Sequence, residues 1–164
     1  MVEDSSLSGL RSESDSALTI LVGVARRTCA IPIREVSEVM RPLPIEAIAS
    51  APVFVRGVSI IRGVPTPVVS LSTFMGLTST NEAETRFVTV RAGERRIALA
   101  VHRFIGMRAL TSVELSGVSP LLSEAPSDYV RALGAADGKL LSVLDCSRLL
   151  RDAEWDSLAP GAQA

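Results

Sequence analysis

Short apolar runs separated by glycines, prolines and charged pairs dominate the sequence, and this pattern is typical of β-strands joined by tight turns. In the segment 55–71, apolar runs at 58–61 and 68–71 flank Arg62 and Gly63. Gly63 can adopt the positive φ of a tight reversal, and the prolines that follow are excluded from central strands. We therefore predict a β-hairpin on a sheet edge with Arg62 at its tip.

The same unit occurs a second time near the C-terminus. Residues 129–150 align without a gap on residues 54–75, so that Gly138 matches Gly63. Asp137 and Gly138 form an Asp-Gly pair, which is a strong short-range hairpin signal. The chain is therefore predicted to contain one β unit twice.

The strands outside these hairpins fit the same repeat. Residues 17–24 and 29–33 form one predicted strand pair, and residues 87–90 and 97–101 form its counterpart. The polar segment 78–85 marks the boundary between the two halves.

One segment has an ambiguous pattern. Ile33, Val36 and Val39 are spaced like one face of a helical turn, although a strand with a bulge fits the spacing as well. We expect Val36 to be exposed, and Ile33 and Val39 to belong to the core.

Two halves of about five short strands each predict an all-β protein with minor α structure, built from two small Greek-key or SH3-like barrels. We expect a flexible, serine-rich and acidic tail at 1–16, a first barrel at about 17–80 and a second barrel at about 86–152. Residues 153–164 are expected to form a short helix, anchored by Trp155, and a frayed end.

Composition narrows the class of function. Hydrophobic residues make up 47% of the chain and aromatic residues only 4%, which predicts an aliphatic core. The net charge of −1 gives no basic footprint for nucleic acid, and few aromatic side chains are present to stack on bases. Without a signal pattern or a membrane-length apolar run, we expect a soluble cytoplasmic protein with reduced cysteines and no direct membrane insertion.

Candidate catalytic and metal-binding residues are few. His102 is the only histidine, and a metal site or a Cys-His nucleophile pair would need Cys29 or Cys146 beside it. Both cysteines lie in apolar strands, where thiols are usually inert. We therefore expect no catalytic residue, no metal and no cofactor, and an enzyme is the weakest hypothesis.

Residues 29–71 and the later segments LAVHRFIGM and YVRALGAADGKLLSVLD resemble the CheW family of chemosensory adaptors. The order and spacing of IPI, V-x-E-V, G-V-x-x-x-R-G and P-V-V-x-L carry this resemblance, which extends over residues 17–152. It implies two SH3-like five-stranded β-barrels around a shared core. It also implies a non-enzymatic scaffold that links the cytoplasmic tips of chemoreceptors (methyl-accepting chemotaxis proteins) to the regulatory domain of a CheA-type histidine kinase.

The resemblance assigns receptor binding, by matching position, to Val36, Glu38, Gly57 and Arg62. It implies that the Arg62 guanidinium meets a carboxylate or backbone carbonyls of the receptor, and that Glu38 holds it in place until then. The alternative interpretation is a solvated turn residue in an exposed ion pair, which stabilises a fold little. The resemblance favours the binding role.

Kinase binding is placed by the resemblance on the other barrel, near Phe87 and Ile97. The sequence departs from the family pattern at Ile60, which replaces a usual Asn, and at Ser70 and His102, which each replace a usual Asp. These departures motivate an alternative function, in which a divergent CheW-like protein binds the receptor, has lost kinase coupling and modulates the pathway. In either case we expect recruitment to membrane-bound receptor arrays through partners.

Overall fold

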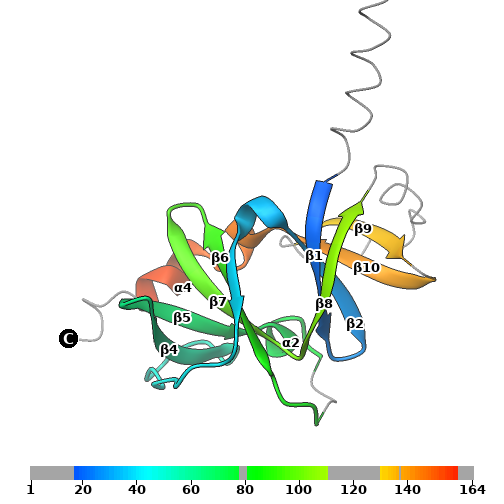
Figure 1. Cartoon of the computed structure of the whole chain (residues 1–164). Coiled ribbons are helices and arrows are strands. Elements are labelled where there is room, and N and C mark those ends of the chain that lie inside the picture. The colour runs from blue at the N-terminus through cyan, green and yellow to red at the C-terminus, as the bar shows by residue number, and fades with distance from the viewer. Residues whose placement is uncertain (1–16, 78–80, 111–129, 137, 159–164) are drawn as a thin grey trace, which may run out of the picture.

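The strands of the described residues form two five-stranded sheets, which lie side by side in Figure 1. The computed structural model describes residues 17–77, 81–110, 130–136 and 138–158. Sheet A contains, in spatial order, β8 (Arg103–Leu110), β1 (Ala17–Val24), β2 (Arg27–Pro32), β10 (Lys139–Leu144) and β9 (Val130–Ala136). Sheet B contains β3 (Val36–Met40), β6 (Arg86–Ala92), β7 (Arg95–Val101), β5 (Val64–Ser70) and β4 (Val55–Ile61). The mostly β architecture predicted from the sequence is confirmed.

Each sheet combines strands from both halves of the sequence. In sheet A, β1 and β2 pair with β8 and β10, and in sheet B, β6 and β7 pair with β3 and β5. When the strands are counted within their own half, both sheets have the order third, first, second, fifth, fourth. The two sheets are thus copies of one unit that have exchanged strands, which agrees with the internal repeat.

This exchange corrects the predicted division into barrels at about 17–80 and 86–152. After β2 the chain turns through a 3-10 helix, η1 (Ile33–Glu35), and β3 then pairs with β6 instead of β1. His102 alone separates β7 from β8, and its N–H donates to the Gly23 carbonyl of β1 at 3.1 Å. Apolar periodicity identifies strands, but it carries no information about which distant strand completes each sheet.

The two repeated hairpins have the same register. Val55 lies opposite Val69 in the first hairpin, and Val130 lies opposite Leu144 in the second. Each residue of the second pair lies 75 positions after its counterpart in the first pair. A bulge follows Val55 and has its counterpart at Val130. The first hairpin turns through Arg62 and Gly63, whose φ angles are 53° and 77°, so the tip predicted at Arg62 is confirmed.

Among the described residues, the buried apolar side chains form three clusters, and the largest lies between the two sheets. It combines residues of sheet A, such as Val22 and Ile31, with residues of sheet B, such as Val90 and Leu99. A fully buried side chain of this kind contributes about 1.5–3 kcal/mol relative to an exposed one. The two barrels therefore share a core, as the sequence resemblance implied.

Each sheet also encloses a small cluster of its own. In sheet A this cluster contains Leu21, Ala30, Leu110, Leu141 and Val143. In sheet B, Met40 of β3 and Ile61 of β4 belong to one cluster, although β3 and β4 are the two outermost strands. Sheet B must therefore curl until its outer strands approach each other, which is the geometry of a small barrel.

The segment around Ile33, Val36 and Val39, whose spacing fits either a helical turn or a bulged strand, contains both. Residues of η1 form a single 3-10 turn, and β3 follows directly with a register shift between Val36 and Glu38. The bulge lets Val36 and Val39 both pack against the shared core, although an unbroken strand would turn them to opposite faces.

Short helices complete the described chain: α2 (Leu71–Phe74), η3 (Cys146–Arg148) and α4 (Asp152–Ser157). The predicted C-terminal helix is therefore present, and its Trp155 packs against the shared core with the Arg95 guanidinium 4.8 Å from the ring centroid. None of the described helices has the length and apolar character needed to cross a membrane. The tail predicted at 1–16 and the frayed end at 159–164 lie outside the described residues.

Candidate functional site

Arg62 and Glu38 form an exposed, two-point ion pair. The Arg62 Nε atom donates to Glu38 Oε2 at 3.2 Å, and Nη2 donates to Glu38 Oε1 at 3.1 Å. The Arg62 side chain is 74% exposed and the Glu38 side chain 28% exposed. Parallel hydrogen bonds fix the orientation of the guanidinium plane, so a large part of it is presented to solvent in a defined position.

The ion pair sets the charge state of both groups. Hydrogen bonding to Arg62, with added electrostatic attraction from Arg62 and Arg96, lowers the pKa of the Glu38 carboxyl below its ordinary value. The hydrogen bond and charge of Glu38 raise the pKa of the Arg62 guanidinium. Both side chains are therefore charged over the physiological pH range.

The two residues come from opposite edges of sheet B. Glu38 lies in β3, the first strand of the sheet, while Arg62 lies at the tip of the hairpin that β4, the last strand, forms with β5. Thr89 positions Glu38, because its Oγ1 accepts from the Glu38 backbone N–H at 3.1 Å. The ion pair thus bridges the place where the barrel closes.

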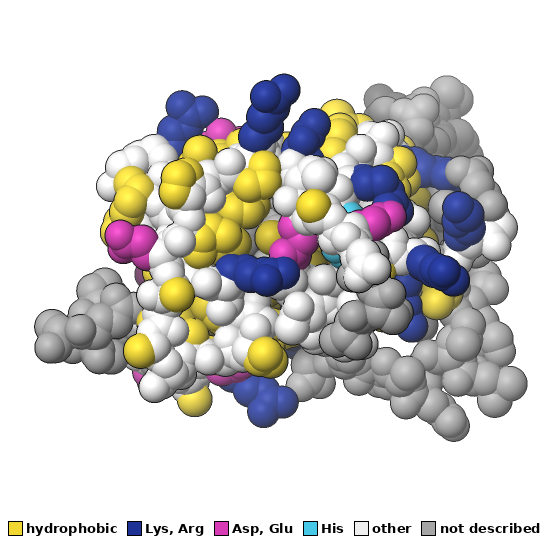
Figure 2. Space-filling view, turned by 90° about the horizontal axis from the view of Figure 1, so that it is seen from below, with side chains coloured by type: hydrophobic (Ala, Val, Ile, Leu, Met, Phe, Trp, Pro, Cys, Tyr) yellow, Lys and Arg dark blue, Asp and Glu magenta, His cyan; other side chains and the backbone are white. Residues whose placement is uncertain are grey.

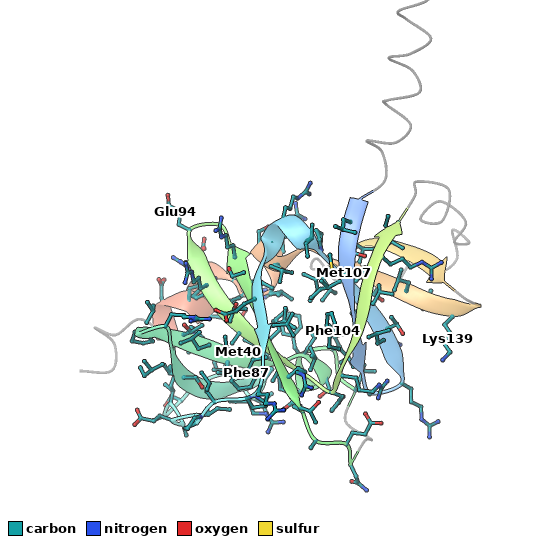
Figure 3. All side chains as sticks on the ribbon, in the orientation of Figure 1. Met40, Phe87, Glu94, Phe104, Met107 and Lys139 are labelled. Carbon is teal, nitrogen blue, oxygen red and sulfur yellow. The ribbon has the colours of Figure 1, made fainter. Side chains whose placement is uncertain are left out.

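An apolar seam at the rim of the shared core includes residues of β3, the strand that also carries Glu38. Val36 and Val39 face this core from β3, and Met107 and Phe104 face it from β8, because they lie opposite the core residues Ile20 and Val22 in the ladder. Figure 3 shows Phe104 and Met107 in the space between β8 and β3. We name Val36, Val39, Phe104 and Met107 the β3–β8 seam.

The exposed part of the seam comes from β8. Met107 is 59% exposed and Phe104 is 41% exposed, whereas Val36 and Val39 are half-buried. Our sequence analysis expected Val36 to be the exposed residue and did not identify either β8 residue. The available signal was the repeat itself, because residues 102–107 correspond to residues 34–39 and therefore place Met107 at the position of Val39.

Gly57, the remaining residue of the predicted receptor set, has a structural role in the free protein. It is buried at φ 145°, and a Cβ atom there would lie only 2.0 Å from the Glu46 carbonyl oxygen. This close approach exists because the connector bridges β4 through two hydrogen bonds of 2.8 Å between Glu46 and Val58. Gly57 therefore supports the hairpin that carries Arg62.

The predicted kinase contacts, Phe87 and Ile97, are corrected by the structure. Phe87 is 1% exposed and Ile97 is 0% exposed. Phe87 belongs to the cluster inside sheet B, and Ile97 belongs to the shared core. The run from Phe87 to Val90 is buried on both faces, so it lacks the alternation that would have separated core positions from surface positions.

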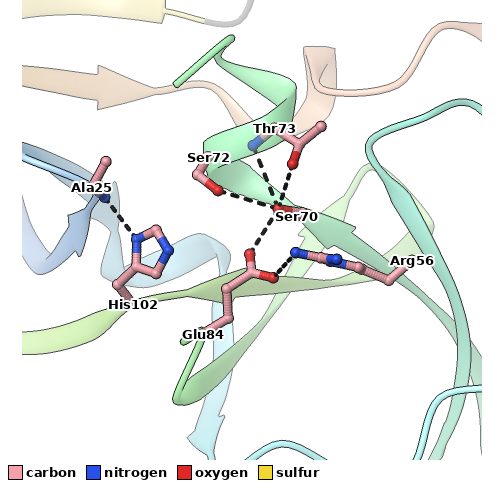
Figure 4. Close-up of polar contacts among 7 residues, drawn as sticks. All are labelled: Ala25, Arg56, Ser70, Ser72, Thr73, Glu84 and His102. Atoms are coloured by element: carbon pink, nitrogen blue, oxygen red, sulfur yellow. Dashed lines mark hydrogen bonds and ion pairs between the residues drawn. The ribbon is translucent and has the colours of Figure 1, made fainter. Parts of the chain in front are cut away.

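At Ser70 and His102 the sequence departs from the family pattern, and Figure 4 shows the hydrogen bonds that these two residues make instead. Ser70 lacks a carboxylate, but its Oγ donates to Glu84 Oε2 at 2.7 Å, and Arg56 donates to Glu84 Oε1 at 2.6 Å. Ser70 Oγ also accepts from the backbone N–H of Thr73 and caps α2. In the second half, Asp145 keeps its own carboxylate and accepts from the backbone N–H of Ser147 at 3.1 Å.

His102 performs a similar acceptor role at the β1–β2 turn. Its Nδ1 atom accepts from the backbone N–H of Ala25 at 2.7 Å, and Ala25 has a φ of 54°. Arg103 covers the same turn, donating to the Ala25 carbonyl at 3.3 Å and to Glu82 Oε2 at 2.7 Å. Seen from below, charged side chains of both signs lie side by side on the surface, and little of the histidine reaches it (Figure 2).

The described residues offer little for covalent or metal chemistry. Burial raises the pKa of the Cys29 thiol to about 12, so the reactive thiolate is not formed at physiological pH. Across the described ranges, no three His, Cys, Asp or Glu side chains are grouped so that they could hold a metal ion. An exposed charged pair on a strand that also borders an apolar seam can instead bind a protein surface.

Two interlocked small barrels with such a surface define a double-barrel protein-binding module. The family model described as "CheW-like domain" matches residues 19–154, and the chain therefore belongs to the CheW family. Chemotaxis protein CheW of Klebsiella aerogenes is 23% identical over 149 residues, covering 90% of both chains. Chemotaxis protein CheW of Helicobacter pylori is 22% identical over 146 residues, covering 87% of this chain and 88% of the relative.

A solved structure supports the fold independently. The scaffolding protein TtCheW from Thermoanaerobacter tengcongensis superimposes with a TM-score of 0.73 at 17% sequence identity. The superposition covers 85% of this chain and 90% of that one. The fold predicted from the sequence, two SH3-like barrels around a shared core, is confirmed.

Proposed function

We propose that this protein is a chemosensory adaptor that binds the cytoplasmic tip of a chemoreceptor and the regulatory domain of a CheA-type histidine kinase. Membership of the CheW family supports the adaptor class. The observation that carries the receptor-binding part is the fixed, 74% exposed Arg62 side chain, which is held by Glu38 of β3, the strand that also contributes to the β3–β8 seam. The proposed action is binding alone, in the cytoplasm, with recruitment to receptor arrays through partners.

The receptor tip is expected to bind as an amphipathic helix. Its apolar face would cover Met107 and Phe104, which are exposed on β8 opposite the core residues Ile20 and Val22. A carboxylate or backbone carbonyls of the helix would bind the free part of the Arg62 guanidinium, while Glu38 keeps the group in place. The structure therefore offers both an apolar contact and an orienting polar contact.

The kinase would bind a different surface, and this proposal assigns no contact to the buried Phe87 and Ile97. The alternative of a divergent protein without kinase coupling rested on Ile60, Ser70 and His102. Glu84 supplies the carboxylate that Ser70 lacks, and His102 accepts a turn N–H, so these two departures leave the fold intact. We therefore favour the complete adaptor.

A paired pull-down tests the proposal. The baits are the wild-type protein, Arg62→Glu and Arg26→Glu, a matched control because Arg26 is exposed at the β1–β2 turn. The prey are the receptor tip and the kinase regulatory domain from the same genome. We expect the wild type and the control to retain both prey, and Arg62→Glu to lose only the receptor.

The remaining outcomes are also informative. Retention of the receptor without the kinase by the wild-type protein would favour the divergent adaptor. Retention of neither prey would overturn the adaptor function.

A further inference from the structure

Two further arginines lie on the same face of sheet B as the Glu38–Arg62 pair. Arg91 of β6 and Arg96 of β7 are direct partners in the antiparallel ladder, so their side chains share one face. Glu38 lies opposite Thr89, two residues before Arg91 on that same face. Both arginines are exposed at the end of the barrel where Glu38 lies.

Electrostatics connect these arginines to the ion pair. The charge of Arg96 contributes to the lowered pKa of the Glu38 carboxyl, which places its guanidinium within interaction range of that group. The single carboxylate of Glu38 is already engaged by Arg62 through two hydrogen bonds. The rim formed by Glu38, Arg62, Arg91 and Arg96 therefore carries three positive charges against one negative charge.

Arg91 and Arg96 have no hydrogen-bonding partner among the described residues that explains their position. Neither forms a hydrogen bond or an ion pair with another residue in the described parts of the chain. Like charges directly opposite in an antiparallel ladder destabilise the pair. Arg95, their neighbour on the other face, differs because it packs over the Trp155 ring.

We propose that Arg91 and Arg96 extend the Arg62 site into a basic rim that binds an acidic segment of the receptor tip. This inference rests on the proposed function and adds the chemistry of the partner, which must present at least two carboxylates. Charge complementarity and continuity with the Glu38–Arg62 pair identify the occupant. Exposed rim charges act mainly on the association rate and on its salt dependence.

The test compares the full-length wild-type protein with Arg91→Thr, Arg96→Thr and the double variant. Binding of the purified receptor tip is measured by stopped flow and calorimetry across a series of salt concentrations, and thermal unfolding is followed in parallel. Threonine is chosen because it favours strands. Arg26→Thr is the control, because it removes an equal charge from an exposed turn of sheet A.

We expect the double variant to associate about fivefold to tenfold more slowly at low salt, with a flatter salt dependence. Its unfolding temperature should be at least close to that of the wild type, because removing the cross-strand repulsion offsets the lost attraction between Arg96 and Glu38. Weaker binding at unchanged or higher stability separates a binding role from a structural one. Arg26→Thr should match the wild type in both measurements.

Other results would overturn the inference. If the wild type binds the receptor tip and the double variant binds with the same rate and salt dependence, the basic rim is refuted and the proposed function stands. If the wild type does not bind, both are refuted.

A full-length variant with the acidic side chains of the N-terminal segment neutralised tests whether that segment occupies the rim instead (Glu3→Gln, Asp4→Asn, Glu13→Gln, Asp15→Asn). Faster association of this variant only when Arg91 and Arg96 are present would assign the rim to that segment and overturn the receptor assignment.

Discussion

Glu38 and Arg62, 24 residues apart in sequence, join the two outer strands of sheet B through a pair of nearly equal hydrogen bonds of 3.1 and 3.2 Å. The corresponding positions of the other half are Gly106 and Asp137, so the sequence provides no equivalent ion pair for sheet A. The repeat therefore supplies two similar barrels, and this pair distinguishes sheet B from sheet A.

The ion pair predicts a specific dependence of stability on pH. Because the pKa of the Glu38 carboxyl is lower in the folded protein, its contribution is fully present above the unfolded pKa and is lost as pH falls through the folded value. Glu38→Gln should be less stable than the wild type at neutral pH, and the difference should vanish in acid. Urea unfolding at several pH values measures it, and a difference that stays constant with pH would contradict this origin.

Gly57 predicts a stability effect that depends on space as well as backbone conformation. Gly57→Ala should cost about 2 kcal/mol or more, because the new Cβ would collide with the Glu46 carbonyl oxygen. Gly63→Ala is the matched control, since its φ is also positive but a Cβ meets nothing within 4 Å. The control should cost only about 1 kcal/mol. Equal losses in denaturant unfolding would show that crowding at Gly57 is relieved by a shift of the connector.

The turn held by His102 predicts which substitutions are tolerated. His102→Ala should lose about 1–3 kcal/mol, because the Ala25 N–H would be left without its acceptor at 2.7 Å. His102→Asn retains an oxygen acceptor and should recover most of that loss in thermal unfolding. If asparagine is as destabilising as alanine, ring packing, and not the hydrogen bond, would explain the effect.

The Ser70–Glu84 hydrogen bond predicts a compensating pair of substitutions. Ser70→Asp alone should destabilise the protein, because it places a second carboxylate beside Glu84 within a buried network. Adding Glu84→Gln removes the repulsion and should restore much of the stability. A double-mutant cycle by chemical denaturation measures the coupling, and additive effects would show that the two side chains act independently.

The β3–β8 seam predicts a binding defect without a folding defect. Met107→Gln should leave the unfolding temperature almost unchanged, because the side chain is 59% exposed, and should weaken binding of the receptor tip about tenfold. Leu140→Gln is the control, as Leu140 is similarly exposed at 42% on β10. Equal binding by both variants, measured by calorimetry, would exclude Met107 from the interface.

Local features were predictable from the sequence, whereas long-range pairing was not. The hairpin with Arg62 at its tip was predicted correctly, because turn chemistry is encoded within a short segment. The partnership of Arg62 with Glu38 came from the family resemblance, and the hydrogen bonds between them agree with it. The exchange of β3 and β8 between sheets was not predicted, because apolar periodicity does not specify a distant partner. The family resemblance placed Phe87 and Ile97 on a surface although they lie in the core, and their strands, buried on both faces, lack the alternation that would have shown it.

The sequence also did not reveal which groups interact with Ser70 and His102, the two positions where the family usually has an aspartate. Ser70 and His102 suggested weakened sites, but Glu84 reaches Ser70 from 14 positions away, and Ala25 meets His102 across 77 positions. Only the folded chain brings these groups within hydrogen-bond distance.

The exchanged strands give the molecule a mechanical property. Each sheet is completed by hydrogen bonds to the other half of the chain, so no hinge between independent barrels is available in the described structure. A force applied at the Arg62 tip reaches sheet A through the common packed interior and through the chain crossings from β2 to β3 and from β7 to β8. A protein with this architecture would move as a rigid body, so that the displacement of one bound partner would be transmitted to the other without loss at a flexible joint.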